Sequence, residues 1–106
     1  MNEDRIAQLQ KFREESPDDP FILYALATEY KEETPQKAKE LFDELLEKHE
    51  NYIGTYYHAA ALYAEFFERD IADEIYQKGI ALAQKNGEHH ALRELQNAYT
   101  NFQFEE

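Results

Sequence analysis

An apolar pattern that recurs every 33 to 34 residues constrains the fold of this chain more than any other feature of its sequence. Leu26 is followed 33 residues later by Ala59, and Ala38 is followed 34 residues later by Ala72. A period in this range indicates supersecondary units that stack on one another. Stacks of this kind usually form binding surfaces and rarely form catalytic sites. The recurring positions are Leu23, Leu26, Ala27, Tyr30, Ala38 and Phe42 in the first copy, and Tyr56, Ala59, Ala60, Tyr63, Ala72 and Tyr76 in the second.

The spacing of the apolar residues predicts an all-α chain, because no alternating apolar pattern is long enough for a strand. The short connections predict that consecutive helices are antiparallel neighbours. The six expected helices span residues 3–15, 20–32, 35–49, 52–67, 71–85 and 88–102.

Caps, prolines and one glycine indicate where these helices begin and end. Asp19-Pro20 and Thr34-Pro35 each mark a start, because the first residue of each pair caps and the proline fits the first turn. Asn86-Gly87 marks a left-handed stop after the fifth helix. The other expected caps are Asn2 for the first helix, Asn51 for the fourth, and Asp70 with Asp73 for the fifth.

Composition limits which binding partners and which cellular compartment we expect for this chain. The net charge is −12, from 23 acidic and 11 basic residues, which argues against binding to nucleic acid or to an anionic membrane surface. The absence of cysteine excludes disulfides and thiolate–metal sites. Met1 is followed by neither a basic segment nor an apolar run, so we expect an acidic, soluble, cytoplasmic protein.

The recurring pattern resembles the tetratricopeptide repeat, in which an aromatic residue and Leu-small-x-x-Tyr on one helix precede Ala-x-x-x-Phe on the next. The matching residues are Leu26, Ala27, Tyr30, Ala38 and Phe42 in one repeat, and Tyr56, Ala60, Tyr63, Ala72 and Tyr76 in the other. The departures are Leu23 in place of the aromatic residue, Ala59 in place of leucine, and Glu50 and Gln84 in place of the closing prolines.

The resemblance covers nearly the whole chain and implies one domain, residues 1–106, whose antiparallel helix pairs stack in a right-handed superhelix. It consists of a half repeat (3–17), two repeats (20–50 and 52–86) and a capping helix (88–102). The alanines of the pattern are expected at close helix crossings and its aromatic residues in the core. Gly79, which is unfavourable within a helix, is expected where another backbone approaches closely.

The resemblance also implies a function, because in this family the first helices of successive repeats line a concave groove that holds a partner peptide. Tyr24, Tyr57 and His90 are spaced by 33 residues each and would form a ladder along that groove. Its lining suits a basic or apolar segment, so we expect a scaffold or adaptor that binds protein. The expected groove residues are Phe21, Tyr24, Thr28, Lys31, Tyr57, His58, Ala61, Glu65, His90, Glu94 and Asn97.

Two other functions remain open at this stage. Phe102 and Phe104 would contact a second copy if the chain is a structural homodimer without a peptide ligand. His58 and His90, with Glu65 or Glu94, would be the ligands of a zinc site, but a surface or groove role suits these histidines better. We expect no catalytic residue, metal or cofactor, because the sequence contains no glycine-flanked nucleophile and no phosphate-binding glycine loop.

Overall fold

The computed structural model describes residues 2–105, and within them the chain is all-helical, with no strand. The helices are α1 (Glu3–Glu15), α2 (Pro20–Tyr30), α3 (Pro35–Lys48), α4 (Gly54–Glu65), α5 (Arg69–Asn86) and α6 (His89–Phe104). They form two compact units, of which the first ends at Tyr52 and the second begins at Ile53. The prediction of six helices is therefore confirmed, and the two units are described in turn.

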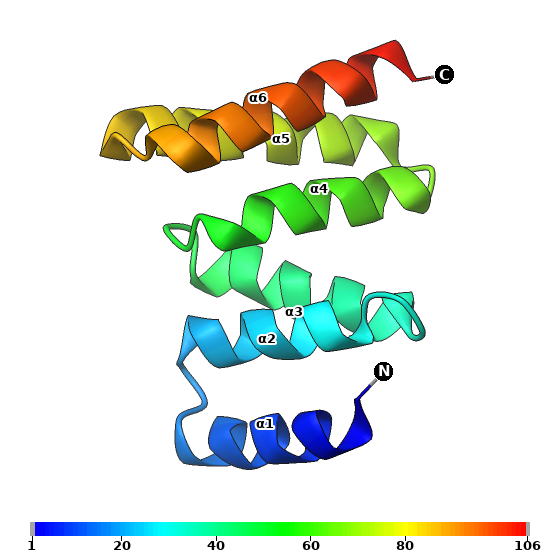
Figure 1. Cartoon of the computed structure of the whole chain (residues 1–106), viewed down its shortest axis with the longest axis vertical. Helices are drawn as coiled ribbons and strands as arrows, with labels where there is room; N and C mark the ends of the chain where they lie inside the picture. Colours follow the sequence, from blue (N-terminus) through cyan, green and yellow to red (C-terminus); the bar gives the residue numbers. More distant parts are fainter. Residues whose placement is uncertain (1, 106) are drawn as a thin grey trace. The chain divides into compact units, whose positions relative to one another are not determined.

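The first unit contains α1, α2 and α3, which run antiparallel in sequence order (Figure 1). Helix α2 packs against both of the others. Tyr30 of the first copy of the recurring pattern is only half-buried, so its expected place in the core is wrong. The core between α2 and α3 is fully buried and contains the other five residues of that copy, together with Leu45. These residues are Leu23, Leu26, Ala27, Ala38, Phe42 and Leu45.

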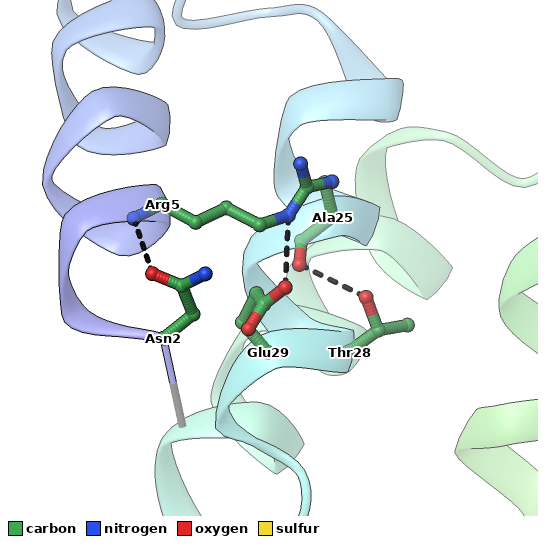
Figure 2. A network of polar contacts seen from close by, with 5 residues as sticks. All are labelled: Asn2, Arg5, Ala25, Thr28 and Glu29. Carbon is green, nitrogen blue, oxygen red and sulfur yellow. Dashed lines mark hydrogen bonds and ion pairs between the residues drawn. The ribbon is translucent and has the colours of Figure 1, made fainter.

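Polar contacts hold α1 against its neighbours in the first unit. The Arg5 backbone N–H donates to Asn2 Oδ1 at 3.0 Å, which confirms the predicted cap of α1. Figure 2 shows the Arg5 side chain reaching α2, where its Nε lies 2.8 Å from Glu29 Oε1. Arg13 makes a similar pair with Glu44 of α3 at 2.9 Å. Two ion pairs thus supplement the apolar contacts of Ile6 and Leu9, which are buried.

The second unit contains α4, α5 and α6, which are again antiparallel in sequence order (Figure 1). Helix α4 contacts both α5 and α6. The predicted close approach at Gly79 is confirmed, because a Cβ there would lie 2.6 Å from the Cβ of Tyr56 and 3.2 Å from Leu95 Cδ1. Gly79 therefore lets α5 pack against α4 and α6 at one point.

The predicted cap of α4 and its predicted C-terminal end are both wrong. It begins at Gly54 after Ile53, which makes no side-chain cap, so Asn51 does not cap it. The segment before it forms a turn in which the Tyr52 backbone N–H donates to the His49 carbonyl at 3.0 Å. The helix ends at Glu65 because Phe67 takes a left-handed backbone conformation, with φ of 61°, which a helix cannot continue.

The expected capping of α5 by Asp70 and Asp73 is also wrong. The helix begins at Arg69, so Asp70 lies in its first turn. Asp73 instead accepts a hydrogen bond from the Tyr99 hydroxyl of α6 at 3.0 Å, and it also accepts one from Gln77. The predicted stop is confirmed, because Gly87 has a φ of 67° and its backbone N–H donates to the carbonyl of Gln84 at 3.3 Å.

Candidate functional site

A cleft of about 380 Å³ lies between α4 and α6 of the second unit. Both helices contribute side chains to its walls, and Tyr76 of α5 also lines it. We refer to it as the α4–α6 cleft. The lining residues are Tyr57, Ala61, Ala64, Glu65, Tyr76, Ala98, Asn101, Phe102 and Glu105.

The α4 wall is formed mainly by Tyr57, Ala61 and Glu65, all of which were predicted as groove residues. Their spacing of four residues places them on one face of the helix. The Tyr57 side chain is 42% exposed, and its ring meets that of His58 edge-on at 5.3 Å. The small side chains of Ala61 and Ala64 leave space between the helices, and this space is the cleft.

The α6 wall consists of Ala98, Asn101 and Phe102, and Glu105 follows the helix end. Phe102 is only 5% exposed, and its ring centroid lies 5.4 Å from that of Tyr76. Arg69 stacks on the Phe102 ring at 4.1 Å and donates to the carbonyls of Phe102 at 2.8 Å and Glu105 at 3.1 Å. These contacts fix the C-terminal end of α6 beside the cleft.

The cleft is acidic and aromatic. Among its described lining residues, Glu65 and Glu105 carry carboxylates and none is a lysine, arginine or histidine. Burial raises the pKa of Tyr76 above its ordinary value, and the nearby Tyr57 and Glu105 raise this pKa further. Both carboxylates belong to exposed residues, Glu65 on α4 and Glu105 after α6.

The predicted groove residues of α6 lie outside the lining of this cleft. His90 and Glu94 are exposed on α6 and face one another, with His90 Nε2 3.2 Å from Glu94 Oε1. Asn97 is also exposed, one turn before Asn101. His58 is half-buried beside Tyr57 and is likewise not among the residues that line the cleft.

The other predicted groove residues belong to the first unit. Phe21 is exposed on α2, and Lys31 is half-buried directly after this helix. Tyr24 packs against Tyr52 with 5.5 Å between ring centroids. The Thr28 hydroxyl donates to the carbonyl of Ala25 at 2.9 Å, within its own helix (Figure 2). The ladder of Tyr24, Tyr57 and His90 involves both units, and it stays a prediction.

Sequence reasoning missed the α6 side of the cleft, which is formed by Ala98, Asn101, Phe102 and Glu105. The family pattern pointed to the first half of α6. The signal for the second half is the aromatic pair Tyr99 and Phe102, whose rings stack at 6.3 Å and which both contact Tyr76. Phe102 is buried, so it does not project toward a second copy as the homodimer hypothesis required, whereas Phe104 is 84% exposed.

Other kinds of site find little support in residues 2–105. These residues contain no group of three or more His, Asp or Glu side chains arranged to hold a metal ion. None of the helices in this range is long and apolar enough to span a membrane.

Among the solved structures that are similar to this chain are two tetratricopeptide repeat domain structures. A crystal structure of a tetratricopeptide repeat domain protein from Salinibacter ruber has a TM-score of 0.78 and 40% sequence identity, over 83% of this chain and 99% of that chain. A solution NMR structure of a tetratricopeptide repeat domain protein from the same organism has a TM-score of 0.79 and 40% identity, over 86% and 93% of the two chains. No family model matches the sequence, and no curated protein matches it.

Proposed function

The chain belongs to the tetratricopeptide repeat family, and on this basis we propose that it is a protein-interaction module whose α4–α6 cleft binds a segment of a partner protein. Helical repeats of this kind use their surfaces to bind other proteins. The bound segment would lie along α4 and α6 as a helix or an extended strand. The chain would then act as a scaffold or adaptor and not as an enzyme.

The composition of the cleft is the observation that carries this proposal. Tyr57 offers a partly exposed ring and a hydroxyl, while Ala61 and Ala98 leave room for a side chain of the partner. Asn101 adds an amide that both donates and accepts hydrogen bonds. Aromatic residues beside polar groups are typical of the energetically important parts of protein interfaces.

The test is affinity capture from a lysate of the source cells, with the full chain as bait. Two variants alter the cleft: Tyr57→Ala removes its exposed ring, and Ala61→Gln fills its space. We expect both variants to lose a partner that the wild-type chain captures, with binding weakened at least about tenfold for Tyr57→Ala. Helical circular dichroism shows whether each variant is folded.

Phe67→Ala is the matched control, because Phe67 is an aromatic residue of the same unit that is 90% exposed and does not line the cleft. This variant should capture the same partner as the wild type. If the folded cleft variants capture everything that the wild type captures, the cleft is not the binding site.

Self-association as a homodimer is the second candidate. The observation behind it is that the rings of Phe67 and Phe104 are exposed and are therefore accessible to a second copy of the chain. Sedimentation velocity of the wild-type chain at micromolar concentration separates the two candidates. A dimer that dissociates in Phe104→Ser would support self-association, and a monomer would leave binding of another protein as the function.

A further inference from the structure

We infer that the α4–α6 cleft recognises a cationic side chain, lysine or arginine, of its partner segment. The inference rests on the proposed function and adds to it the chemical class of the group that enters the cleft. It is drawn from the arrangement of carboxylates, aromatic rings and small residues around one space of about 380 Å³.

The cleft has carboxylates from two different elements. Glu65 lies on the last turn of α4, and Glu105 follows α6. Both side chains are exposed, so neither is committed to the core. With no basic residue among the described residues that line the cleft, the negative charge there is compensated only from outside its lining. A ligand ammonium or guanidinium group would supply the missing positive charge.

The aromatic residues favour the same ligand. The Tyr57 ring is partly exposed at the cleft, and aromatic faces attract lysine and arginine cations. The structure already contains one such contact beside the cleft, since Arg69 stacks on Phe102 at 4.1 Å. Arg69 itself lines a separate pocket with Asp70 and Asp73, and it is not among the described residues that line the α4–α6 cleft.

The small residues leave room for the stem of such a side chain. Ala61 and Ala98 contribute only methyl groups from opposite helices. The methylene chain of lysine or arginine buries well against apolar surface while its charged end stays with polar groups. The net charge of −12 would increase the rate at which a basic partner approaches the whole chain.

The test uses small probes and the full chain in a two-dimensional NMR titration. The cationic probes are N-acetyl-lysine N-methylamide and N-acetyl-arginine N-methylamide. N-acetyl-norleucine N-methylamide has the apolar stem but no charge. We expect the cationic probes to shift the amide signals of Tyr57, Asn101 and Phe102 saturably, and the neutral probe to bind at least about threefold more weakly.

Charge variants of the protein test the same inference by changing the cleft and keeping the probes the same. Glu65→Gln and Glu105→Gln should each weaken binding of the cationic probes by about two- to fivefold. Glu74→Gln is the matched control, because it removes one exposed carboxylate from α5 outside the cleft, and it should leave binding unchanged. Increasing the salt concentration from about 0.01 M to about 1 M should weaken binding of the cationic probes more than binding of the neutral probe.

The outcomes separate this inference from the proposed function. Equal binding of the neutral and cationic probes at the cleft would overturn the cation inference and would still support a cleft that binds partner side chains. Binding of the cationic probes that is unchanged in Glu65→Gln and Glu105→Gln, or no binding of any probe, would also overturn it. Capture of a partner that depends on Tyr57 would then stand as evidence for the proposed function alone.

Discussion

Gly79 shows how one residue sets the distance between three helices. Alanine at this position would favour the helical conformation of α5 by about 1 kcal/mol relative to glycine. Its Cβ, however, would lie 2.6 Å from the Cβ of Tyr56, an atom attached directly to the α4 backbone. Tyr56 is unable to avoid this contact by rotating its side chain, so α4 and α5 would have to separate.

We therefore predict that Gly79→Ala destabilises the protein by about 1–2 kcal/mol, because overpacking outweighs the gain in helix propensity. Urea unfolding followed by circular dichroism measures the change. Lys78→Ala, at the neighbouring exposed position, should change stability by less than about 0.5 kcal/mol. A Gly79→Ala protein that is more stable than the wild type would contradict the idea that this approach requires glycine.

At the scale of the element, the C-terminal end of α6 depends on α5. Arg69 holds this end through two carbonyl oxygens and the face of the Phe102 ring. The last carbonyls of a helix have no partner within the helix, so a cation from a neighbouring helix stabilises them. The position of Glu105 at the cleft follows from the same contacts.

We predict that Arg69→Met, which retains an apolar stem, frays the last turn of α6 and destabilises the protein by about 1–2 kcal/mol. Amide hydrogen exchange should accelerate mostly in residues 102–105. Arg93→Met removes an exposed arginine from α6 itself and should leave both quantities nearly unchanged. Equal exchange in the wild type and Arg69→Met would show that the helix end is held by apolar packing alone.

At the scale of the whole molecule, tyrosines of both units make the stability of the protein depend on pH in the alkaline range. Tyr52 of the first unit and Tyr76 and Tyr99 of the second each have a pKa raised above the ordinary 10.0, with burial as the main cause. A raised pKa means that the folded protein holds these protons more tightly than the unfolded chain. The stabilisation is complete below pH 10 and is lost as the pH rises through the folded-state values.

We predict that the free energy of unfolding is constant with respect to these tyrosines up to about pH 9 and falls above about pH 10. Urea unfolding at a series of pH values measures it. Tyr76→Phe removes one of the three groups and should make the fall shallower. A slope that is the same in Tyr76→Phe would show that ionisation of Tyr76 does not contribute to the loss of stability.

The sequence by itself determined the helices and the core of this protein. Period and prolines predicted six helices, and the starts at Pro20 and Pro35 and the stop at Gly87 are where they were expected, although Thr34 makes no side-chain cap at Pro35. These signals are local, because they depend on the backbone preferences of one or two residues. The apolar pattern likewise predicted the fully buried Ala38, Phe42 and Ala72, since helical periodicity assigns a face to each residue.

Tertiary structure decided the details that depend on contacts between helices. Asp73 lies at a position where the sequence predicted a helix cap. Its carboxylate instead accepts a hydrogen bond from the Tyr99 hydroxyl, because α6 brings that hydroxyl within 3.0 Å. The α4 half of the cleft was predicted from family spacing, whereas its α6 half depends on Tyr76, Phe102 and Arg69 meeting across two helices. No spacing within one helix encodes such a meeting, so residues such as Asn101 and Glu105 became candidates only once the helices were packed.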